Sequence, residues 1–164
     1  MHWKNKFILT FLFLFYGCIS SVFISSISNQ TIEKNSPIYI SKFDGISMEE
    51  KIFREKLNTA LKRKGYYTVN NFQKSEYYLF TNFNNRLQKN INQKKNIDMF
   101  SMELLLMESK HITNNSDLPI GKEDALWVCK IQLNWLEFLK HQDSLVEAIS
   151  KYFCNTYYGN RILF

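Results

Sequence analysis

The feature that most constrains this chain is a long uncharged stretch close to its amino terminus. Lys4 and Lys6 precede it, and no charged residue occurs from Phe7 to Ile32. Its first part, Phe7–Tyr16 (FILTFLFLFY), is an almost unbroken apolar run. A basic start followed by such a run is the layout of a secretory signal, and the lysines keep the amino end on the cytoplasmic side. We therefore expect the rest of the chain to fold outside the cytoplasm.

Three fates of this leader remain open. The first is lipidation, because Gly17 and Cys18 supply a small residue and then a cysteine, although two aromatic residues stand just before them. The second is simple cleavage before Asn29, after small serine residues. The third is a retained transmembrane helix, since Phe7–Ile27 holds 21 uncharged residues. Each fate leaves the body of the chain on the outer side of the membrane.

Composition favours one folded domain behind the leader. The chain has 164 residues, and its 14 Phe, 9 Tyr and 3 Trp need an interior in which to pack. We expect residues 1–28 to be a signal peptide or membrane anchor, 29–36 a polar tether, and 37–164 a single domain.

The net charge of the chain is +6, and the two leader lysines contribute part of it. The remaining surplus is spread along the sequence and favours contact with anionic surfaces. For an exported protein these would be the phosphates of phospholipid or lipopolysaccharide. Aromatic residues that could stack on nucleic-acid bases serve as core in a sheet covered by helices, so we expect no nucleic-acid partner.

The best-marked element is a helix that follows a short strand at Pro37–Phe43. Ser47 stands three residues before Glu50, which is the spacing of a capping box. Apolar residues then recur at helical spacing up to Lys64, and Gly65 follows as a stop signal.

Three strands are predicted next. Strand-forming residues fill Tyr77–Phe83, and Ile97–Ile112 alternates so that Phe100, Met102, Leu104 and Leu106 share one face. The polar stretch Asn84–Asn96 between them is predicted to be a hairpin loop or mobile tip. The third strand, Leu126–Trp135, shows the cleanest alternation in the sequence and follows a loop at Thr113–Asp124.

The final part of the chain is predicted to be helical. Leu136–His141 either extends the preceding strand or starts a helix, and Ser144 with Glu147 forms a second capping box. Tyr157–Phe164 is expected to be a short terminal segment. The layout is therefore β-α-β-β-β-α, an α+β fold with one mixed or antiparallel sheet and two helices packed on one face.

No catalytic motif is present in the sequence. It lacks the glycine-rich phosphate and dinucleotide patterns, GxSxG and HExxH. His111 and His141 have no carboxylate or cysteine at ligand spacing and are expected at the surface. We therefore predict a protein that is not an enzyme, with no catalytic residues, no metal site and no cofactor.

Two features remain as candidate sites. If Cys18 is lipidated or removed, Cys129 and Cys154 form an even pair in an oxidising compartment, so a disulfide is permitted. It is not required, because single cysteines are often small buried hydrophobes. The second feature is a basic segment with anion-binding potential, formed by Arg86, Lys89, Lys94 and Lys95.

The layout resembles the small periplasm-facing lipoproteins that assist envelope assembly, above all the lipopolysaccharide-assembly lipoproteins (LptE). The features are a leader ending near Gly17-Cys18, a polar tether, the strand PIYISKF, a helix closing on Gly65, three strands and a last helix. The resemblance spans Cys18 to Tyr158 and depends most on Pro37–Phe83. It implies a protein of the outer membrane that binds lipopolysaccharide and plugs the translocon barrel.

These observations predict a non-catalytic envelope protein that is tethered to the membrane through its N-terminus, faces the periplasm and acts as an assembly or scaffold factor. Its partner would be an outer-membrane protein or an anionic glycolipid. The alternative is a secreted effector or secretion-system component that acts by binding other proteins.

Overall fold

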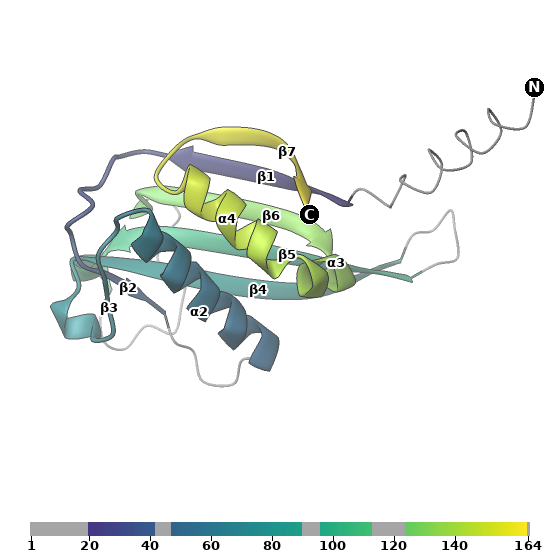
Figure 1. Ribbon diagram of the computed structural model, residues 1–164, viewed down its shortest axis with the longest axis horizontal. Helices are drawn as coiled ribbons and strands as arrows, with labels where there is room; N and C mark the ends of the chain where they lie inside the picture. Colours follow the sequence, from purple (N-terminus) through teal and green to yellow (C-terminus); the bar gives the residue numbers. More distant parts are fainter. Residues whose placement is uncertain (1–19, 42–46, 90–95, 113–123, 164) are drawn as a thin grey trace, which may run out of the picture.

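The computed structural model describes residues 20–41, 47–89, 96–112 and 124–163. These residues form one mixed seven-stranded sheet with helices packed on one of its faces (Figure 1). The predicted α+β class, with a single sheet and two principal helices on one face, is therefore confirmed.

The elements follow the chain in a simple order. The strands are β1 (Ser20–Ser28), β2 (Ile38–Ile40), β3 (Thr68–Val69), β4 (Tyr77–Lys89), β5 (Asn96–Glu108), β6 (Trp127–Asn134) and β7 (Tyr157–Leu163). The helices are α2 (Met48–Arg63), α3 (Trp135–Lys140) and α4 (Gln142–Tyr152), and short 3₁₀ turns lie at Phe72–Lys74 and Ser109–His111.

The strand order in the sheet is β3-β2-β4-β5-β6-β1-β7. β2 runs parallel to both of its neighbours, β3 and β4, and the other neighbouring pairs are antiparallel. A parallel pair needs a crossover connection, and α2 with β3 provides it between β2 and β4. The first and last strands of the chain, β1 and β7, thus lie together at one side of the sheet.

Helix α2 confirms the predicted signals at both of its ends. The side chain of Ser47 accepts a hydrogen bond from the backbone N–H of Glu50 at 3.3 Å, as an N-cap should. Gly65 adopts φ +88°, the left-handed conformation that commonly ends a helix. The inward face of the helix is fully buried against the sheet and consists of Phe53, Leu57, Ala60 and Leu61.

The last strand is tied to α4 by stacked aromatic rings. Tyr157 at the start of β7 stacks on Tyr152 of α4, with ring centroids 3.8 Å apart, and the Arg161 guanidinium lies over both rings. The segment that the sequence predicted as a short terminal tail is therefore a seventh strand with its own contacts to the helical layer.

The N-terminal boundary of the domain differs from the prediction. Ser20–Ser28 was assigned to the leader, yet it forms β1, which pairs with β6 on one side and β7 on the other. Val22 and Ile24 are almost fully buried, because the alternation of this segment matches the pleat of a strand. The domain thus begins by Ser20, and only residues 1–19 of the predicted leader lie outside the described residues.

Several other boundaries also change. The predicted loop at Asn84–Asn96 is shorter, since β4 continues to Lys89 and β5 starts at Asn96. The segment predicted either to extend the strand or to start a helix is helical from Trp135 to Lys140, and His141 is the C-cap of this helix. Helix α4 starts at Gln142 with His141 as its N-cap, so Ser144 lies inside the helix and the second capping box was wrong.

Other predicted segments are only partly described. β2 covers Ile38–Ile40 of the predicted strand, whereas Phe43 lies outside the described residues, as do residues 113–123 of the predicted loop. Within the ranges that the structure describes, no helix has the length and apolar character needed to cross a bilayer.

Candidate functional site

The start of β1 marks one end of the sheet, which we call the leader end. Ser20 pairs with Leu163 near the C-terminus, and Phe23 lies opposite Gln132 of β6. Helix α3 follows directly after β6 at this same end, as Figure 1 shows. The opposite end of the sheet, where β1 finishes at Ser28, is called the far end.

Aromatic packing fixes α3 against the sheet at the leader end. The Phe138 ring lies 4.4 Å from that of Phe100 on β5 and 5.4 Å from that of Phe53 on α2, measured between centroids. Trp135 stacks on Phe138 at 5.0 Å, and the side chain of Asn134 caps the helix. Residues three apart share one face of a helix, so this pair forms the inward face of α3.

The outward face of α3 is apolar. Leu136 is 65% exposed and Leu139 is 39% exposed, again three residues apart. Lys140 beside them is exposed as well. The inward face of α3 is already packed against the core, so these two leucines do not contribute to it. Two exposed leucines on such a short helix are unusual.

The hairpin of β4 and β5 extends past the rest of the sheet at the leader end. Met99 is the first β5 residue that pairs with β6, yet β5 pairs with β4 from Asn96 onward. Three residue pairs therefore project as a two-stranded ribbon by about 10 Å, given a rise of roughly 3.3 Å per residue. Arg86, opposite Met99, and Lys89, in the terminal pair, belong to this hairpin.

Two of the four predicted anion-binding residues are thus brought to the leader end on a strand rather than on a loop. The other two, Lys94 and Lys95, lie outside the described residues, in the connection between β4 and β5. Cys18, the predicted lipid anchor, also lies outside them, two residues before β1.

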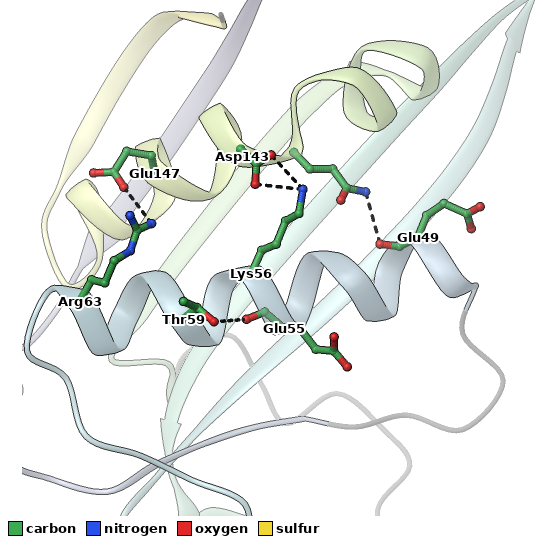
Figure 2. A network of polar contacts seen from close by, with 8 residues as sticks. Glu49, Glu55, Lys56, Thr59, Arg63, Asp143 and Glu147 are labelled. Carbon is green, nitrogen blue, oxygen red and sulfur yellow. Dashed lines mark hydrogen bonds and ion pairs between the residues drawn. The ribbon is translucent and has the colours of Figure 1, made fainter.

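A second candidate site is the seam between α2 and α4, shown in Figure 2. Lys56 of α2 forms an ion pair with Asp143 of α4 at 2.9 Å, and the Gln142 side-chain amide donates to the backbone carbonyl of Glu49 at 3.3 Å. A shallow hollow of about 280 Å³ opens between the helices, lined by Ile52, Glu55, Lys56, Thr59, Arg63, Asp143 and Val146.

The charges of this seam are paired across the two helices. Glu147 lies 2.9 Å from Lys64 and 3.6 Å from Arg63, and the hydrogen bond from Lys64 lowers the pKa of Glu147 below its ordinary value. Glu50, at the other end of α2, has a raised pKa because it is partly buried. The seam brings together no nucleophile with a general base. Its ion pairs and hydrogen bond hold α2 and α4 together, which is a structural role.

The cysteines behave as buried hydrophobes. Cys129 on β6 and Cys154 after α4 are both free thiols within the main core cluster, so the permitted disulfide is not formed in the structure. Burial raises the pKa of each thiol to about 12. Both therefore stay protonated near neutral pH and are poor nucleophiles.

The histidines differ from expectation in two respects. Each faces a glutamate: His111 lies 3.4 Å from Glu108 and His141 lies 3.3 Å from Glu137. His141 is also half-buried rather than at the surface. In the described part of the chain, however, no three His, Cys, Asp or Glu side chains gather as a metal site.

No protein-family model matches the chain, and no curated protein matches its sequence. Among solved structures, it is similar to a PDZ domain protein from Parabacteroides distasonis, with a TM-score of 0.52 and 11% identity. The alignment covers 96% of this chain but 42% of that protein, so the chain spans less than half of its length. At this identity the likeness shows a shared fold alone.

The chain is also similar to PelC from Paraburkholderia phytofirmans, which was solved as a dodecamer in two crystal forms. The TM-scores are 0.46 and 0.45, with 10% and 11% identity. The alignments cover 80% and 79% of this chain and 94% and 95% of PelC.

Proposed function

We propose that this chain is a non-catalytic, exported envelope protein, held at a membrane by a lipid on Cys18 and acting as an assembly or scaffold factor. The observation that carries the proposal is the start of β1 at Ser20, two residues after Cys18. Processing at Cys18 keeps the sheet whole. Cleavage before Asn29 would remove β1, which pairs with both β6 and β7.

The position of β1 also weighs against a retained transmembrane helix. Eight of the 21 uncharged residues considered for such a helix, Ser20–Ile27, belong to a strand of the sheet. The 13 residues Phe7–Ile19 remain, and a helix of that length spans about 20 Å, against roughly 30 Å of hydrocarbon. A lipid on Cys18 fits the available length better.

The partner that the chemistry favours is an anionic glycolipid of the lipopolysaccharide class, or an outer-membrane protein that handles it. The β4–β5 hairpin supports this choice, because Arg86 and Lys89 lie on β4 and Lys94 and Lys95 follow in the connection to β5. Lysine and arginine bind phosphate groups through charge-assisted hydrogen bonds. This role agrees with the resemblance to the lipopolysaccharide-assembly lipoproteins.

A lipidation assay tests the anchorage. Palmitate label is expected in the wild-type protein and in Cys154→Ala, which removes a thiol elsewhere, and it is expected to vanish in Cys18→Ala. The labelled protein should fractionate with membranes. Label that persists in Cys18→Ala, or unlipidated wild-type protein in the culture supernatant, would contradict the proposal, and the second result would favour the secreted effector.

Binding to purified lipopolysaccharide tests the partner. The double variant Lys94→Glu with Lys95→Glu should bind about tenfold more weakly or worse, because two attractive contacts become repulsive. The matched control is Lys62→Glu with Lys151→Glu, which makes the same charge change on the two helices. Equal binding by the two double variants would remove the glycolipid from the proposal.

A further inference from the structure

We propose that the leader end of the sheet is a membrane-contact surface, whose exposed apolar side chains on α3 enter the interface of a phospholipid bilayer. This inference rests on the proposed anchorage at Cys18 and goes beyond it. An anchor fixes one point of the chain, whereas a contact surface also fixes the orientation of the domain.

The exposed apolar residues of the described chain gather at this end. Seven large hydrophobic side chains are exposed. Four of them lie at the leader end, namely Met48, Leu136, Leu139 and Ile162, whereas Ile27, Tyr67 and Tyr158, the second residue of β7, lie toward the far end. Ile162 projects from the sheet face opposite to the helices, because its neighbour Leu163 is buried in the core, whereas the two leucines lie on the helical side. These residues share one end of the domain, and neighbouring exposed apolar residues such as Leu136 and Leu139 mark an interaction site more often than isolated ones do.

Contacts within the fold place two of these four residues. Met48 starts α2, and its neighbour Glu49 accepts a hydrogen bond from Gln142, the first residue of α4, directly after α3. Ile162 of β7 lies opposite Ser21 of β1. Ile162 therefore lies beside the start of β1, and Met48 lies beside the start of α4.

The leucines of α3 cannot turn inward. Trp135 and Phe138 already fill the inward face of the helix, and Phe138 is fully buried among the rings of Phe53, Phe83 and Phe100. Leu136 and Leu139 must therefore project away from the core. In a bilayer interface such side chains are buried a few ångströms below the headgroups, roughly 5–10 Å for an interfacial helix.

The short stretch of chain between the proposed anchor and the sheet favours a bilayer as the partner of the leader end. Cys18 precedes Ser20 by two residues, which span about 7 Å at full extension. A lipid on Cys18 thus holds the leader end within one side-chain length of the headgroups.

The leader end carries charged residues of both signs. Lys89 lies on the projecting ribbon, Arg86 lies at the base of the ribbon opposite Met99, and exposed Lys140 follows the leucines of α3. Lysine side chains at such a boundary extend their ammonium groups to the headgroups. Acidic residues lie at this end as well, namely Glu49 and Glu50, half-buried at the start of α2, Asp98 on the ribbon, Glu137 on α3, and Asp143, which is 84% exposed and paired with Lys56.

Quenching by brominated lipids tests this inference. The full-length lipidated chain carrying Leu139→Cys is labelled with an environment-sensitive maleimide dye and reconstituted into vesicles of phosphatidylethanolamine and phosphatidylglycerol. Cys129 and Cys154 are buried with raised pKa values, so the dye reacts with the new thiol. Brominated acyl chains should lower the emission about twofold, since the side chain lies at the acyl boundary.

The matched control is Tyr67→Cys, an exposed hydrophobic position at the far end, whose dye should not be quenched. Equal emission from the two positions, with or without bromine, would overturn the membrane-contact surface. Failure of the proposed anchorage gives a different result, because a chain without lipid on Cys18 would be missing from the purified lipidated fraction before any vesicles are made.

Discussion

The two ends of the sheet are built differently. At the far end, backbone hydrogen bonds tie the connecting segments to one another: Tyr67 donates to Lys34 at 2.9 Å, Ile38 donates to Tyr67 at 2.9 Å, and Asn29 donates to Leu126 at 2.8 Å. At the leader end, α3 packs on the sheet through aromatic rings and leaves two leucines exposed.

This difference shows which end of the domain is complete by itself. Backbone groups in the far-end connections find partners within the chain, as buried or half-buried polar groups must. The apolar surface of the leader end finds no such partner among the described residues, and the proposed anchor at Cys18 precedes β1 at this end. Backbone hydrogen bonds hold the connections of the far end, whereas the leader end is the surface that we propose contacts a membrane.

The largest effect is expected inside α3. Phe138→Ala should destabilise the domain by about 3–5 kcal/mol, because it removes a fully buried ring from the aromatic packing at the leader end. Urea unfolding monitored by circular dichroism measures the change. The neighbouring Leu139→Ala is the control and should cost less than about 0.5 kcal/mol, since that side chain is exposed. Similar losses in both variants would mean that the outward face of α3 also belongs to the core.

A smaller effect is expected at the far end. Gly65 holds φ +88° after α2, a conformation that side chains with a Cβ adopt only at a cost. Gly65→Ala should lower the free energy of unfolding by about 1 kcal/mol. Lys62→Ala, in the last turn of the same helix, should change it by less than about 0.5 kcal/mol. A neutral Gly65→Ala would show that this helix end is less constrained than the structure indicates.

The smallest effect concerns the ion pair between Glu147 and Lys64. The folded-state pKa of Glu147 lies below its ordinary value of 4.5, so this group contributes stability above the unfolded pKa and loses it as the pH falls through the folded pKa. Both side chains are largely exposed, and the contribution should be only about 0.2–1 kcal/mol. Unfolding curves between pH 7 and pH 3 should show a weaker acid dependence for Glu147→Gln than for the wild type. Identical slopes would contradict the pairing.

Local signals in the sequence were sufficient for the helix α2 and for the inward faces of β5 and β6. Ser47 and Gly65 mark the helix ends through contacts within one turn, and alternation marks the strands without reference to the rest of the chain. These elements could be predicted because their determinants lie within a few residues of one another.

Strand β1 could not be placed in the same way. Val22, Ile24 and Ser26 do alternate with more exposed residues, but they continue an apolar leader and share its composition. The contacts that make this segment a strand come from β6 and β7, and Ser20 pairs with Leu163 across almost the whole chain. A local sequence pattern does not indicate pairing between residues that lie so far apart in the chain.

The candidate site was predictable only in its parts. Cys18 and the basic residues Arg86 and Lys89 were recognised from the sequence. The sequence did not show that β1, which follows Cys18, starts at the same end of the sheet as these basic residues. The exposure of Leu136 and Leu139 follows from the packing of Phe138 against rings on other elements. The ion pair of Lys56 with Asp143 likewise joins two helices that no motif connects.

The account rests on β1 being part of the mature domain and leading directly to the anchor. Mass spectrometry of the N-terminal peptide of the mature protein tests this most directly. We predict that the mature chain begins with a diacylglycerol-modified Cys18, followed by Ile19 and the intact strand Ser20–Ser28. A mature chain that begins at Asn29, without β1, would contradict the account.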